Sequence, residues 1–122
     1  MADRPAAAFE FVDDVTGFRA RGALAVVVSG RLRRKADLLR ALSKGLEFPS
    51  YFGWNWDALE ECLRDLSWLG ERQCIVLVHK HVPLSNEEQR RIYLSILQSA
   101  QTAHEGALRV VFPERERRLV EI

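Results

Sequence analysis

The sequence predicts an α/β protein: a small parallel sheet of three strands, packed with helices. Three apolar runs of strand length alternate with longer stretches that have the periodicity of amphipathic helices. Strands that are joined through helices pair in parallel, with right-handed crossovers. A chain of 122 residues has room for one hydrophobic core but not for two. One small domain is therefore expected.

The first strand and the first helix are predicted at residues 23–29 and 35–46. The strand, ALAVVVS, is a continuous apolar run, which is typical of a strand that is covered on both faces. The helix is amphipathic and ends near Gly45 and Pro49, residue types that commonly follow helices. Its inward face is formed by four leucines: Leu38, Leu39, Leu42 and Leu46.

The second half of the chain repeats this pattern, with a strand at 74–80, a helix at 85–104 and a strand at 107–112. The helix is expected to open with a capping box, in which Ser85 caps the first turn and Glu88 bonds back to the cap. Its periodicity predicts four buried residues: Ile92, Ile96, Leu97 and Ala100.

The predicted domain spans residues 23–113, between an N-terminal extension and a C-terminal tail. Within the extension, residues 1–22, the sequence FEFV alternates like a strand and is a candidate for an additional edge strand. The tail, residues 114–122, is charged and then apolar, so it either folds back onto the domain or stays mobile.

The segment FPSYFGWNWDALEECLRDL, residues 48–66, is the most informative part of the sequence. Asn55 is a good N-cap, because its side chain can accept hydrogen bonds from the free N–H groups of a first helical turn. Pro49 and Gly53 indicate a loop before the helix. One side of the helix is apolar and carries Trp56, Leu59, Cys62, Leu63 and Leu66. The other side carries Asp57, Glu60, Glu61 and Arg64.

The acidic side of this helix has two interpretations. Most charged faces are simply solvated, and an acid in the first turn favours the helix N-terminus. However, Asp57 and Glu61 are like charges one turn apart, which costs on the order of 0.2–0.5 kcal/mol. Three aromatic residues, Tyr51, Phe52 and Trp54, are candidates for exposure beside them. An acidic pair next to exposed aromatic side chains is typical of a protein–protein interface.

The order of residues in FPSYFGWNWDALEECL, 48–63, resembles the motif of a known family. The barstar family, intracellular inhibitors of small secreted bacterial ribonucleases, has the pattern LP-x-YYG-x-N-x-DAL-x-(D/E)CL. The resemblance extends over residues 23–113, but this block carries almost all of its specificity. It implies a barstar-like fold with a small parallel sheet, and the function of a ribonuclease inhibitor.

The resemblance also implies roles for individual residues. Tyr51 and Gly53 match loop residues that contact the nuclease in the family, and Asn55 matches the capping residue beside them. Asp57 matches an acid that faces the basic active site. Glu61 matches the principal acid of the family, which occupies the place of a substrate phosphate.

Several positions depart from the family pattern. Trp56 and Glu60 fall at positions that contact the nuclease but hold different residue types. Glu61 has a longer side chain than the Asp that the family also uses. Gln101 stands where a later helix of the family supplies a further acid, so that contact is in doubt. These differences indicate a different nuclease partner, or the same class held in a shifted pose.

The expected function is blockage of the active site of a small microbial, guanyl-specific, barnase-like ribonuclease, in a 1:1 heterodimer. The acidic helix would mimic RNA phosphates and complement the basic site electrostatically. The expected approach surface consists of Tyr51, Gly53, Trp54 and Asn55. The acidic contacts are Asp57, Glu60 and Glu61, with Trp56 beside them. No cofactor, metal, membrane or nucleic-acid partner is expected.

Two other functions remain open. The same acidic surface would also suit an interaction module whose partner is not a nuclease. The run RLRRKADLLR, residues 31–40, has five basic residues against Asp37 and would suit a nucleic-acid-binding regulator. No aromatic residues interleave with this run to stack on bases, so a solvated loop and helix start is the simpler interpretation.

The sequence favours a cytoplasmic protein that is not an enzyme. It has no apolar stretch of about 18 residues, and MADRPAAAFEFVDD lacks the order of a secretory signal. Asp57 and Glu61 lie on a convex helix, which argues against a glycosidase pair. His79 and His81 lack a third metal ligand nearby in sequence. The two cysteines, Cys62 and Cys74, are expected to be reduced and structural.

Overall fold

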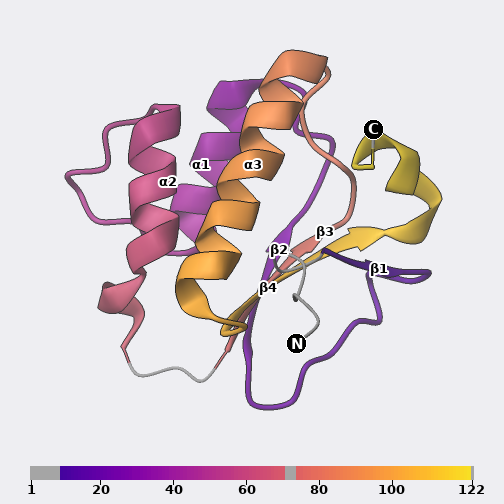
Figure 1. Ribbon diagram of the computed structural model, residues 1–122, viewed down its shortest axis with the longest axis horizontal. Helices are drawn as coiled ribbons and strands as arrows, with labels where there is room; N and C mark the ends of the chain where they lie inside the picture. Colours follow the sequence, from indigo (N-terminus) through magenta and orange to yellow (C-terminus); the bar gives the residue numbers. More distant parts are fainter. Residues whose placement is uncertain (1–8, 71–73, 122) are drawn as a thin grey trace, which may run out of the picture.

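Four parallel strands form the sheet of this protein, in the order β1-β4-β3-β2. The computed structural model describes residues 9–70 and 74–121, and three α-helices of these ranges stand side by side on one side of the sheet (Figure 1). The strands are β1 (Glu10–Val12), β2 (Leu24–Val28), β3 (Ile75–His79) and β4 (Leu108–Pro113). The helices are α1 (Lys35–Gly45), α2 (Trp56–Asp65), α3 (Glu87–His104) and the short 3-10 helices η1 (Ser67–Leu69) and η2 (Glu114–Leu119).

The parallel α/β architecture is confirmed, but the sheet has four strands where the sequence predicts three. The additional strand is β1, the FEFV candidate, which pairs with β4. Arg109 of β4 holds it with a bidentate ion pair to Glu10, at 2.7 and 2.6 Å. The Phe9 and Phe11 rings also pack against the ring of Phe112. The sheet therefore extends N-terminal to residue 23, because long-range contacts outweigh the shortness of this strand.

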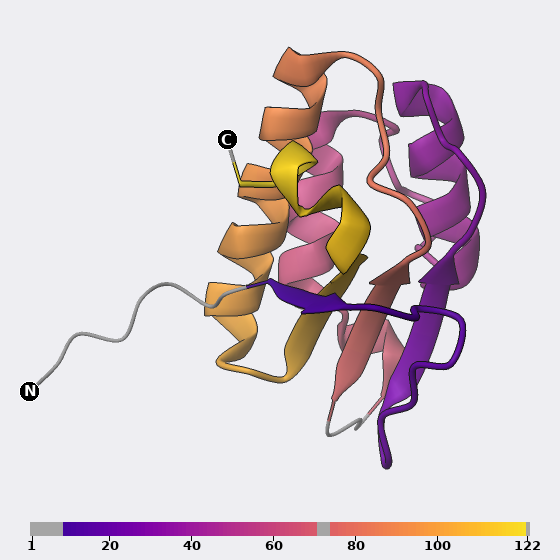
Figure 2. The same ribbon diagram turned by 90° about the vertical axis from the view of Figure 1, so that its right-hand side faces the viewer.

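Alternation along the strands divides the sheet into two unequal faces. The face toward the helices is part of the main core and contains Val26, Val28, Ile75, Leu77, Leu108, Val110 and Phe112. The other face carries Val76, Val78 and Val111, and it is covered in part by Val15 and neighbouring residues before β2 (Figure 2). The prediction that β2 is covered on both faces is wrong: Val27 is 51% exposed, because β2 is the edge strand.

The inward faces of the helices follow the predicted periodicity, with exceptions in α3. The four leucines predicted for α1 are all buried. In α3 the N-cap is Asn86, whose side chain accepts from the N–H of Gln89 at 2.9 Å, so the predicted capping box at Ser85 is wrong. Ser85 instead points its hydroxyl at the carbonyl of Arg33. Ile92 is 37% exposed and not buried, since α3 packs through the neighbouring Tyr93, Leu97 and Ala100 face.

The C-terminal tail folds back onto the domain. Glu116 of η2 accepts hydrogen bonds from the His81 ring at 2.9 Å and from the backbone N–H of Val82 at 2.7 Å. Arg117 lies over the ring of Phe11, with its guanidinium carbon 4.1 Å from the centroid. The tail is thereby attached both to the β3–α3 connection and to β1, which decides between the two alternatives for this segment.

The two histidines of the H-x-H pattern make separate internal contacts. His79 is fully buried: its Nδ1 donates to the carbonyl of Val111 at 3.1 Å, and its Nε2 accepts from the hydroxyl of Tyr93 at 2.7 Å. Burial lowers the pKa of His79 to about 4 and raises the pKa of Tyr93. His81 bonds to Glu116. Within the described residues no three potential metal ligands gather.

The cysteines and the helices carry no further specialised feature. Cys62 and Cys74 are both free thiols in the structure, as expected. Among the residues that the structure describes, no helix has the length and apolar character needed to cross a membrane.

Candidate protein-binding surface

The loop before α2 is held from below by aromatic packing. Phe52 is buried, with its ring centroid 4.8 Å from that of Phe48 and 4.9 Å from that of Trp54. Phe48 in turn packs edge-on against Trp68, whose indole N–H donates to the carbonyl of Leu46 at 2.9 Å. Phe52 is therefore an anchor for the loop, which corrects its assignment as an exposed aromatic residue.

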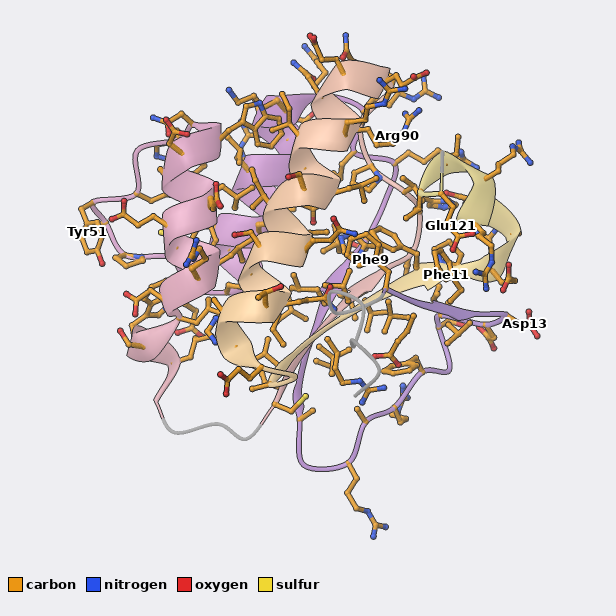
Figure 3. The ribbon with its side chains drawn as sticks, viewed as in Figure 1. Phe9, Phe11, Asp13, Tyr51, Arg90 and Glu121 are labelled. Carbon is orange, nitrogen blue, oxygen red and sulfur yellow. The ribbon has the colours of Figure 1, made fainter. Side chains whose placement is uncertain are left out.

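The other two aromatic residues of this loop are exposed as predicted. Tyr51 is 72% exposed and Trp54 is 53% exposed. Figure 3 shows Tyr51 at the outer tip of the loop, directed away from the sheet. Trp54 has a φ of 57°, in the left-handed region, which is uncommon for a bulky residue. The loop thus presents two large side chains to solvent from a backbone that Phe52 fixes underneath.

Asn55 connects this loop to α2. Its Oδ1 accepts from the N–H of Ala58 at 2.7 Å, which is the predicted N-cap, and its Nδ2 donates to the carbonyl of Gly53 at 3.3 Å. One side chain therefore satisfies both the first turn of the helix and the loop before it. This arrangement fixes where the acidic side of the helix lies relative to Tyr51 and Trp54.

The three acidic residues of α2 that are predicted as partner contacts fall into two groups. Asp57 and Glu61 are exposed, and neither forms an ion pair with any described residue. Glu60 is half-buried and accepts from the hydroxyl of Ser99 on α3 at 2.8 Å, with Arg64 Nη1 4.0 Å away. Among the described residues, Arg64 pairs with Glu60 and not with Glu61. The carboxylates of Asp57 and Glu61 are therefore exposed and form no ion pair with a described residue.

The buried side of α2 packs as predicted, with Leu59, Cys62 and Leu63 in the core. Burial raises the pKa of the Cys62 thiol, and the nearby carboxylates of Glu61 and Asp65 raise it further. A buried thiol with a raised pKa stays protonated at neutral pH and is a poor nucleophile. Cys62 thus belongs to the packing of the helix and not to a chemical site.

A shallow groove between α2 and α3 borders the acidic surface. Trp56 forms one wall, and the ammonium of Lys35 lies 5.0 Å from the centroid of its ring. The α3 side of the groove is formed by Arg91, Ile92 and Ser95, with Ile96 below them. Sequence periodicity placed Ile92 in the core and so missed this contribution. Only the packing of α3 against α2 brings these residues beside the acids.

Gln101 does not take part in this surface. Its side chain is 3% exposed and lies on the buried side of α3, so it is not accessible to a partner. Ser99 of α3, and not Gln101, forms a hydrogen bond with an acid of α2, the one to Glu60.

The sequence that forms this surface lies within a region that matches a known protein family. Residues 23–113 match the Barstar (barnase inhibitor) family, which is most of the chain and includes α2 with its loop. The chain belongs to the barstar family. A separate search among curated proteins found no match to the chain. Barstar-family proteins are non-enzymatic inhibitors, and membership indicates an inhibitor of a barnase-like ribonuclease. The barstar match ends at Pro113, so β1 and η2 lie outside it.

Proposed function

We propose that this protein inhibits a small microbial, guanyl-specific, barnase-like ribonuclease by covering its active site with α2 and the preceding loop. The observation that carries the proposal is the pair Asp57 and Glu61. Both are exposed, they lie one turn apart on a convex helix, and no described residue pairs with either. Tyr51 and Trp54 stand exposed beside them.

Electrostatics explains why such a pair suits a ribonuclease. A nuclease binds substrate phosphates with Arg, Lys and His side chains, and carboxylates accept the same charge-assisted hydrogen bonds. The like charges of Asp57 and Glu61 destabilise α2 slightly when the protein is free. Cations of a bound nuclease would remove this repulsion. The electrostatic energy of the two carboxylates is therefore most favourable when a basic site covers them.

The remaining residues of the surface have supporting roles in this proposal. Gly53 and Asn55 shape the loop so that Tyr51 approaches the nuclease, and Trp56 borders the groove beside the acids. Glu60 contributes less than its neighbours, because its carboxylate already accepts from Ser99. We further propose that the protein acts in the bacterial cytoplasm, where it would protect the cell from a secreted enzyme.

An inhibition assay tests the proposal. Titrating the protein into a guanyl-specific ribonuclease should abolish RNA cleavage at one equivalent, with a 1:1 complex in light scattering. Unchanged cleavage by several such enzymes would instead favour an interaction module that binds another class of protein. Direct RNA binding that is lost when Arg33, Arg34 and Lys35 are neutralised would favour a nucleic-acid-binding regulator.

Replacing Gly53 by alanine should weaken inhibition about tenfold or more without destabilising the fold. An added Cβ would lie 3.5 Å from Ala58 Cβ and from Asn55 Nδ2, which is ordinary contact. The free protein can thus hold the methyl group, whereas overpacking a close interface costs roughly 1–3 kcal/mol. Inhibition constants and thermal melts measure the two effects. Unchanged inhibition would show that no partner atom packs against Gly53.

A further inference from the structure

A second pocket lies at the carboxyl ends of the strands, away from α2. Its lining comes from three segments that follow β2, β3 and β4, and from the start of α3. Figure 2 shows these connections and η2 gathered beyond the arrowheads of the strands. The pocket has a volume of about 320 Å³. In open parallel α/β sheets the crevice beyond the carboxyl ends of the strands is the usual ligand site.

The lining of this pocket is strongly basic. It includes Arg31 and Arg33 from the β2–α1 connection, Arg90 from α3 and Arg118 from η2. Among the described residues, none of these four guanidinium groups pairs with a carboxylate. Their charges converge from three separate segments of the chain, a placement that the sequence does not reveal.

Arg90 is the most constrained of these arginines. Figure 3 shows it on the first turns of α3, on the side that faces the C-terminal segment. Its Nη1 donates to the carbonyl of Leu84 at 2.8 Å, which orients the guanidinium. Its Nε is buried and has no hydrogen-bond partner among the described residues. Buried donors normally have a partner, so an unsatisfied one in a basic pocket points to a missing anion.

The one carboxylate in the lining does not neutralise the arginines. Glu116 accepts from the ring of His81 and from the N–H of Val82. Burial raises the pKa of Glu116, but these hydrogen bonds outweigh it and hold the pKa below its usual value. Glu116 is thus an ionised group whose oxygens are already used. Four guanidinium groups against one occupied carboxylate leave the pocket with a net positive charge.

We propose that this pocket binds the phosphate group of a small phosphorylated molecule. Guanidinium forks match phosphate oxygens in geometry as well as charge. The volume suits a small ligand, and Leu32, Val82 and Leu119 provide apolar walls for its organic part. Among the described residues no Phe, Tyr or Trp lines the pocket, so it lacks the large aromatic surfaces on which proteins stack single-stranded RNA. The proposal uses none of the residues of α2.

Calorimetric titration of the full chain tests this site with three probes: a nucleoside 5′-monophosphate, the same nucleoside without phosphate, and inorganic phosphate. The variant Arg31→Gln/Arg118→Gln removes two exposed charges from the lining. The matched control Arg19→Gln/Arg21→Gln removes two exposed charges outside it. Loss of two charge-assisted contacts should weaken phosphate binding about tenfold or more in the first variant. The control should bind within about twofold of the unmodified protein.

Binding of either phosphate probe, weakened in the first variant and not in the control, supports the site. A comparison of the two phosphate probes tells whether the organic part of the ligand contributes to affinity. Thermal melts of both variants should match the unmodified protein, since the four arginines that they replace are all exposed. The proposal is overturned if neither phosphate probe binds at millimolar concentration. Equal binding of the nucleoside, or equal loss in the control variant, also overturns it.

Discussion

Replacing Glu61 by alanine is expected to weaken inhibition by at least about a hundredfold. Glu61 is exposed in the free protein, has no described ionic partner, and lies beside Asp57 on the outer side of α2. In the proposed complex its carboxylate is buried against nuclease cations. Removing one member of a buried, hydrogen-bonded ion pair costs roughly 3–5 kcal/mol, because the other charge remains buried without compensation. A tenfold change in Kd corresponds to about 1.4 kcal/mol.

The matched comparison is Glu60→Ala, one residue earlier on the same helix. Its carboxylate accepts from Ser99 within the protein, so a partner gains less from it, and its loss should cost less than about tenfold in inhibition. Glu88→Ala, an exposed acid at the start of α3, controls for net charge. Inhibition constants measured side by side give the ranking. Equal or reversed effects of Glu61 and Glu60 would show that the principal acid is assigned to the wrong residue.

The second large effect is a loss of stability as the pH falls from about 6.5 to about 4. His79 has a pKa of about 4 in the folded protein, since burial disfavours its charged form, against about 6.5 when unfolded. In this window the unfolded state binds a proton that the folded state rejects, so the free energy of unfolding decreases with falling pH. The contribution of neutral His79 to the free energy of unfolding is fully present above pH 6.5. About 3 kcal/mol of it is lost when the pH falls to about 4.

The surroundings of His79 explain this resistance to protonation. Tyr93 already donates to Nε2, so an imidazolium would set two donors against each other, and the ring stacks on Phe112 at 4.3 Å. Urea unfolding at intervals between pH 4 and 8 measures the effect. His79→Gln keeps a donor and an acceptor but cannot titrate, so its stability should vary much less across this window. An identical pH profile for the variant would assign the loss to other groups.

Local features of the sequence predicted the local structure of the candidate surface well. The cap at Asn55, the apolar side of α2 and the exposure of Tyr51, Asp57 and Glu61 all depend on residues within two helical turns of each other. Such patterns are set by backbone hydrogen bonding and by 3.6-residue periodicity, which a sequence displays directly. The family pattern also lies within this one block, so fold and surface were recognisable together.

Features that depend on distant contacts were predicted poorly. Ser85 lost its capping role to Asn86 because its hydroxyl points toward Arg33, fifty-two positions away. Val27 is exposed because strand order, and not composition, places β2 at the edge. Glu60 differs from Glu61 through its contacts with Ser99, on another helix, and with Arg64. The basic pocket gathers residues from four elements and has no signature in any one of them.

Hydrogen bonds at several points along α2 hold the helix in place, and this lowers the entropy cost of association. Asn55 fixes its first turn, Ser99 holds Glu60, and the ring of His104 donates to the carbonyl of Leu63 near its end at 2.7 Å. With Phe52 beneath the loop, the backbone of the surface is held in one conformation in the free protein. Binding then loses little conformational entropy, so most of the contact energy is retained as affinity.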